Sequence, residues 1–142
     1  MEIKAADVMQ LRKMTGAGMM DCKKALQEAE GDFERAKDII REKGKLVVAK
    51  RSDRTATEGY VATKVVGGKA YILCLACETD FVAQNSEFSA SANAILELAV
   101  NADAADRDAL LAVKNAEGIT VEAIVTEKSG QTGEKVELAY YA

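Results

Sequence analysis

Histidine is absent from this 142-residue sequence, and cysteine is scarce, with only three residues. Without histidine, the commonest general base of enzymes is missing. No phosphate-binding loop of the G-x-x-x-x-G-K-[ST] type, no G-x-G-x-x-G motif and no serine or cysteine in a known nucleophile setting occurs. Nothing therefore points to an enzyme, although catalysis by a carboxylate or a lysine stays open.

The three cysteines are too few, and odd in number, for a disulfide scaffold, and each has apolar neighbours. Cys74 and Cys77 match the C-x-x-C pattern, but no second such pair exists, and strand positions three apart face opposite sides. We therefore expect buried, reduced thiols in a reducing compartment. No metal site and no cofactor is predicted.

Long apolar runs are missing too: no stretch of about 18 apolar residues exists, and the N-terminus lacks the apolar region of a secretory signal. With 49% hydrophobic and 30% charged residues, the composition is typical of a soluble globular protein. We expect a cytoplasmic protein without membrane contacts. The net charge of −4 is uneven, +3 over residues 1–54 and −7 over residues 55–142, but interleaved signs on helical faces favour solvated surfaces.

Residues 5–43 predict three short helices separated by glycines, with Asp32 as the N-cap of the third. Three one-sided helices form a small bundle, because each is too short to be stable alone. We predict a three-helix module at 1–44, resembling ubiquitin-associated domains, and a basic linker at 45–58 whose start can be helical. The apolar faces should hold Val8 and Leu11, then Met19, Cys22, Leu26 and Ala29, then Phe33, Ala36 and Ile40.

Residues 59–142 predict a second, α+β domain, so the fold class is α+β. Two β-prone runs, 60–66 and 69–77, flank Gly67-Gly68, a hairpin signal because tight hairpin turns need positive φ at both central positions. A helix capped by Ser86 should follow. Its apolar face should hold Phe88, Ala92, Ile95, Leu96 and Ala99.

The remainder predicts short helical stretches at 106–115 and 120–128, then a strand. In that strand Val136, Leu138 and Tyr140 alternate with Glu137, Ala139 and Tyr141. The apolar pattern runs to the last residue without a turn or charge to protect the edge. We therefore expect a fragment of a longer protein, with an incomplete second domain.

Two segments are not explained well by core packing. The first is residues 15–26, where Met19 and Met20 follow two glycines; adjacent methionines cannot share one inward face, and an exposed Met suits an adaptable binding surface. The second is residues 77–85, which places Asp80 beside Phe81 in a connection between elements, where function is often carried. A tight turn with a half-buried Met, and a Phe81 folded onto the core, are the structural alternatives.

These two segments carry a family resemblance. The run from Leu11 to Leu26 (LRKMTGAGMMDCKKAL) resembles the N-terminal signature of elongation factor Ts, and Glu78 to Ala83 (ETDFVA) resembles its second signature. Both occur in the family's order and spacing, and the likeness extends over essentially the whole chain as the N-terminal portion. Family members continue past the point that matches Ala142, so the resemblance implies reduced affinity and exchange activity.

The resemblance implies a guanine-nucleotide exchange factor that binds GDP-bound elongation factor Tu without covalent chemistry. It places Asp80 and Phe81 near the GTPase's magnesium and phosphate site, with Phe81 as the wedge. It implies no cofactor, no catalytic residue and no direct nucleic acid contact. The implied partner-binding residues are Thr79, Asp80, Phe81 and Val82 in the core, and Leu11, Arg12, Gly16, Gly18, Met19 and Met20 in the N-terminal module.

Two other functions remain open from the residues alone. The basic segment 45–54 could bind RNA or ribosomes, although the net charge of −7 over residues 55–142 argues against an extended phosphate-binding face. Asp80 or Glu78 could serve an enzyme as a carboxylate. Release of labelled GDP from elongation factor Tu would separate these alternatives.

Overall fold

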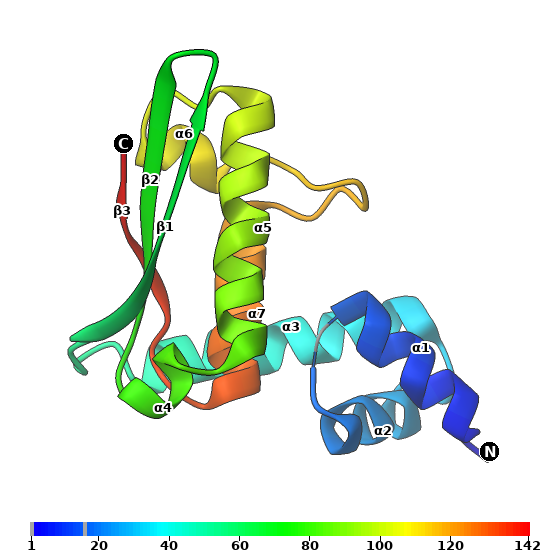
Figure 1. Ribbon diagram of the computed structural model, residues 1–142. Helices are drawn as coiled ribbons and strands as arrows, with labels where there is room; N and C mark the ends of the chain where they lie inside the picture. The colour runs from blue at the N-terminus through cyan, green and yellow to red at the C-terminus, as the bar shows by residue number, and fades with distance from the viewer. Residues whose placement is uncertain (1, 16) are drawn as a thin grey trace. The chain divides into compact units, whose positions relative to one another are not determined.

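The computed structural model describes residues 2–15 and 17–142, which form two compact units (Figure 1). The first unit runs through Ser52 and takes in Thr126–Glu134. The second comprises Asp53–Val125 and Lys135–Ala142. The sequence-based division into 1–44, 45–58 and 59–142 did not assign the segment 126–134 to the N-terminal part.

The first unit is built on helices α1 (Ala5–Thr15), α2 (Met19–Glu28) and α3 (Phe33–Lys50). The Asp32 side chain caps α3 as predicted, accepting hydrogen bonds from the amides of Glu34 and Arg35 at 3.0 and 3.2 Å. Helix α3 continues to Lys50 and so takes in the first part of the predicted linker. The core holds Val8, Leu11, Ala17, Cys22, Ala25, Leu26, Ala29, Ala36 and Ile40.

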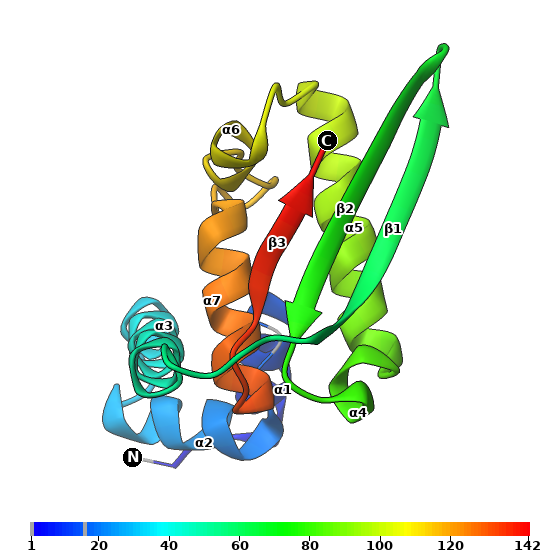
Figure 2. The same cartoon turned by 90° about the vertical axis from the view of Figure 1, so that its left-hand side faces the viewer.

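The second unit contains an antiparallel sheet of β1 (Glu58–Val66), β2 (Lys69–Cys77) and β3 (Glu137–Tyr141), in the order β1-β2-β3. Gly67 and Gly68 join the first two strands with φ of 57° and 80°, which confirms the predicted hairpin. Helix α5 (Ser86–Ala102) lies along one face of this sheet (Figure 2). Its five predicted core residues are all buried.

The shorter helices are α4 (Asp80–Ala83), α6 (Arg107–Leu111) and α7 (Val121–Thr132). Helix α6 ends at Leu111, before the predicted boundary at 115. Asn115 instead forms a turn in which its Oδ1 accepts the amides of Glu117 and Ile119. Helix α7 starts close to its predicted position and runs beyond residue 128.

Two local expectations were wrong. The cap of α5 is Asn85, whose Oδ1 accepts the amides of Glu87 and Phe88, so the predicted Ser86 is the first helical residue instead. In β3, Tyr141 faces the core and Tyr140 is exposed, because the register against β2 shifts at Cys74/Leu75 and leaves Ala139 unpaired. Such a bulge moves every later side chain to the opposite face.

All three cysteines are free thiols, Cys22 and Cys77 buried and Cys74 half-buried, as expected of packed cysteines. Among the described residues, no group of three or more acidic and sulfur ligands is placed to hold a metal ion. Helices long and apolar enough to cross a membrane are also absent from residues 2–15 and 17–142.

Candidate partner-binding surfaces

The connection between β2 and α5 carries the first candidate surface. Thr79, with extended backbone at φ −121° and ψ 155°, precedes the single turn of α4. Three backbone hydrogen bonds close that turn, from the amides of Ala83, Gln84 and Asn85 to the carbonyls of Thr79, Asp80 and Val82 at 3.2, 2.9 and 3.1 Å. The connection is therefore a defined structural element rather than an irregular loop.

Phe81 points away from the core of its unit, with 84% of its surface exposed. The alternative in which Phe81 folds back onto the core is therefore wrong. Val82 and Ala83 instead pack against the core, which anchors α4 from its inner side. The ring therefore lies on the surface of its unit, where it is accessible to a partner.

Two further hydrogen bonds fix the segment before α4. Glu78 Oε1 accepts the amide of Lys135 at 2.9 Å, which ties this segment to the chain entering β3. The Cys77 thiol donates to the Thr79 carbonyl at 3.2 Å. Glu78 therefore has a structural partner, whereas Asp80 is exposed beside Phe81. The arrangement offers a carboxylate and an aromatic ring on a supported turn, which suits binding better than catalysis.

The second candidate surface is the start of α2 together with Ala17 and Gly18 before it, in the first unit. Thr15 Oγ1 donates to the Leu11 carbonyl at 2.8 Å and accepts the Ala17 amide at 3.3 Å. The Cys22 thiol donates to the Ala17 carbonyl at 3.6 Å. Burial raises the pKa of the Cys22 thiol, so the sulfur keeps the proton that this bond requires.

Both methionines of this surface face solvent, Met19 with 43% and Met20 with 63% of its surface exposed. The prediction that Met19 belongs to the buried stripe of its helix was wrong, because Ala25 fills that stripe together with Cys22 and Leu26. The expectation that at least one methionine of this pair is exposed is confirmed, since both are exposed. Flexible methionine side chains suit a surface that adapts to a partner.

The other N-terminal candidates lie at different depths. Arg12 is exposed on α1, and Gly18 is the extended N-cap of α2 with open space where a Cβ would stand. Leu11 is fully buried in the core, so it supports the surface and does not form it. Gly16 lies outside the described residues.

Sequence reasoning missed two features of the first unit. Met9 is 53% exposed on α1, three residues before Arg12, so a further methionine lies on the same helix as that candidate. The sequence indicates this exposure, because Met9 lies outside the buried stripe of α1 that Val8 and Leu11 form. The segment 126–134, which also lines the cavity next to the start of α2, had no local signal at all.

Comparison with known proteins gives a consistent match. Residues 78–142 match the family model described as "Elongation factor TS". The chain is 52% identical over 141 residues to elongation factor Ts of Bacteroides thetaiotaomicron, covering 99% of this chain and 42% of that protein. For Porphyromonas gingivalis the identity is 50% over 141 residues (99% and 52%), and for Rhodopirellula baltica 48% over 136 residues (96% and 41%). The chain thus spans about half the length of these curated relatives.

Proposed function

Because this chain belongs to the elongation factor Ts family, we propose that it acts in translation elongation as a guanine-nucleotide exchange factor. Its partner is the GDP form of elongation factor Tu, from which it promotes release of GDP. The observation that carries the proposal is Phe81, an 84% exposed aromatic on the supported turn of α4.

The action follows from how a GTPase holds its nucleotide. Backbone amides of a loop bind the phosphates, and Mg²⁺ is held by a loop hydroxyl and an acidic group. Phe81 and Asp80 enter near this site and displace those elements, which weakens GDP binding without making or breaking a covalent bond. Exchange is therefore a binding reaction, and the chain needs no catalytic residue for it.

The start of α2 supplies the second contact. Met19 and Met20 dock on the GTPase through apolar contact, and Arg12 of α1 adds a positive charge. Because binding free energies are reciprocal, the factor weakens the binding of GDP to the GTPase by the same ratio by which GDP weakens the binding of the factor. Incoming nucleotide can then expel the factor and complete the cycle.

The experiment is release of labelled GDP from elongation factor Tu at increasing concentrations of this chain, with excess unlabelled nucleotide present. We expect the release rate to rise and then saturate, as it does when a ternary complex forms. The half-maximal concentration reports docking, and the plateau reports the action of the wedge. A release rate that stays at the spontaneous value at every concentration would reject the proposed function.

A further inference from the structure

Within the first unit, α3 and the second half of α7 touch backbone to backbone. A Cβ on Gly130 would lie 2.8 Å from the Cα and 3.1 Å from the amide nitrogen of Gly44. A Cβ on Gly44 would lie 2.7 Å from the carbonyl oxygen of Thr126. Neither glycine has positive φ, so close approach, and not backbone conformation, is what requires glycine at both positions.

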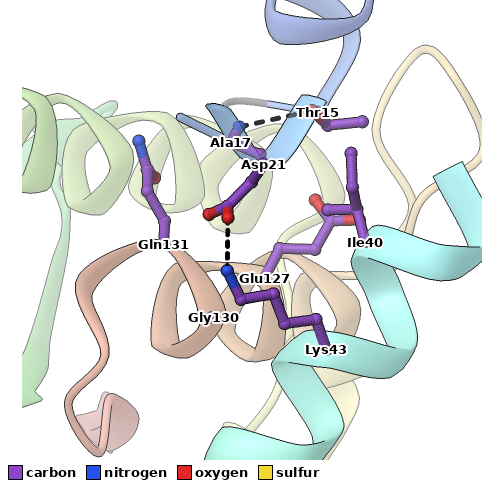
Figure 3. A pocket seen from close by; sticks show the side chains of 8 residues that line it. All are labelled: Thr15, Ala17, Asp21, Ile40, Lys43, Glu127, Gly130 and Gln131. Carbon is purple, nitrogen blue, oxygen red and sulfur yellow. Dashed lines mark hydrogen bonds and ion pairs between the residues drawn. The ribbon is translucent and has the colours of Figure 1, made fainter. Parts of the chain in front are cut away.

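The same segment of α7 forms one side of a small cavity next to the start of α2 (Figure 3). Gly130, Glu127 and Gln131 line it on that side. Thr15 lines it from the end of α1, Ala17 from the residues before α2 and Asp21 from α2 itself. Ile40 and Lys43 line it from α3. Its volume of about 10 Å³ leaves room for about one water molecule, so these walls are nearly in contact.

The first turn of α2 is also fastened to α3. Lys43 Nζ and Asp21 Oδ1 form an ion pair at 2.5 Å across the cavity, and Figure 3 shows the two side chains pointing toward each other. Asp21 follows Met20 directly in this turn, so whatever fixes Asp21 also fixes the backbone from which the exposed methionines project. The turn therefore rests on α3 through an ion pair and faces residues 126–134 across the cavity.

We propose that residues 126–134 are a positioning element for the Met19–Met20 surface. The contact between Gly44 and Gly130 sets how deeply this segment sits against α3, and the segment in turn holds Ala17, Gly18 and the first turn of α2 in place. The effect on partner binding rests on the proposed function. The effect on the conformation of residues 17–22 does not rest on it.

The test uses the whole chain with Gly130→Ala, which forces the segment away from α3. The matched control is Glu42→Ala, an exposed position on α3 two residues from Gly44. In Gly130→Ala we expect faster amide exchange over residues 17–22, including the Cys22 amide that donates to the Gly18 carbonyl at 3.0 Å. We also expect an increase of about tenfold in the half-maximal concentration for GDP release, with an unchanged plateau, because Phe81 lies in the other unit.

Unchanged amide exchange and an unchanged half-maximal concentration in Gly130→Ala would overturn the proposal, as would an equal change in Glu42→Ala. If Gly130→Ala fails to fold, Gln131→Ala removes a wall side chain without adding a clash, and the same two measurements decide in the same directions. If the parent chain does not accelerate GDP release at all, the proposed function fails. Amide exchange over residues 17–22 then decides the positioning role alone.

Discussion

The two candidate surfaces present apolar side chains in opposite ways. In the first unit the exposed groups are methionines at the start of a ten-residue helix, each with several rotatable bonds. In the second unit the exposed group is one phenyl ring on a four-residue turn held by backbone hydrogen bonds and by the packing of Val82. Under the proposed function, this difference corresponds to a division of labour: the adaptable methionine surface supplies affinity, and the supported ring displaces the elements of the GTPase that hold the nucleotide.

The largest effect should come from removing the ring. Phe81→Ala should lower the plateau rate of GDP release about 30-fold, because a buried aromatic anchor at an interface commonly contributes about 2 kcal/mol or more. Its melting temperature should change little, since the ring is exposed in the free chain. Stopped-flow GDP release and thermal unfolding on the same sample measure both.

The matched control for this variant is Val65→Ala, an exposed apolar residue near the hairpin turn of the same unit. It should leave both the plateau and the melting temperature near the parental values. If Phe81→Ala folds normally and still reaches the parental plateau, the ring is not the displacing group and the division of labour is refuted.

The next effect should be on docking. Met19→Ser combined with Met20→Ser should raise the half-maximal concentration for GDP release about tenfold and leave the plateau unchanged, because apolar contact with the partner is lost. The melting temperature should stay within a few degrees. Leu46→Ser, at an exposed position on α3, is the control. A lower plateau with unchanged half-maximal concentration would reverse the roles assigned to the two surfaces.

A smaller effect tests the support of α4 and α5. Asn85→Ala removes the side chain that accepts the amides of Glu87 and Phe88, and such a loss costs about 1 kcal/mol. We expect a melting temperature lower by roughly 2–4 °C, measured by circular dichroism. Ser86→Ala is the control, because the Asn85 side chain performs the capping. If Ser86→Ala costs more than Asn85→Ala, the assigned cap is wrong.

Local chemistry made much of this fold predictable. The hairpin followed from two glycines between β-prone runs, and α3 from the capping carboxylate of Asp32. The face of α5 followed from helical spacing over 17 residues. In each case the residues that determine the structure are close together in the sequence.

The features that escaped prediction depend on distant residues or on very short elements. The bulge that turns Tyr141 inward exists only in the pairing of β3 with β2, and the contact of Gly130 with Gly44 joins segments far apart in the sequence. A glycine inside a helical pattern by itself predicts only a weak helix. For Phe81, one helical turn is too short for periodicity to tell which apolar residue faces inward. The sequence therefore left open whether Phe81 is exposed or packs onto the core.

The smallest predicted effect concerns Glu127, whose half-buried carboxyl lies beside the Met19–Met20 surface in the cavity of the first unit. Burial raises its pKa above the usual 4.5, and the nearby Arg41 guanidinium opposes that shift; Asp21 and Lys43 line the same cavity. The folded state therefore holds this proton more tightly than the unfolded state. The resulting stabilisation is fully present below pH 4.5 and is lost as the pH rises through the folded pKa.

Glu127→Gln, which cannot ionise, should accordingly raise the melting temperature at pH 7 by roughly 1–2 °C and give no gain near pH 4. The control is Glu28→Gln, an exposed position on α2. Because the chain carries a net charge of −4, any lost carboxylate could relieve general repulsion, and an equal gain in both variants at pH 7 would assign the effect to net charge instead of burial.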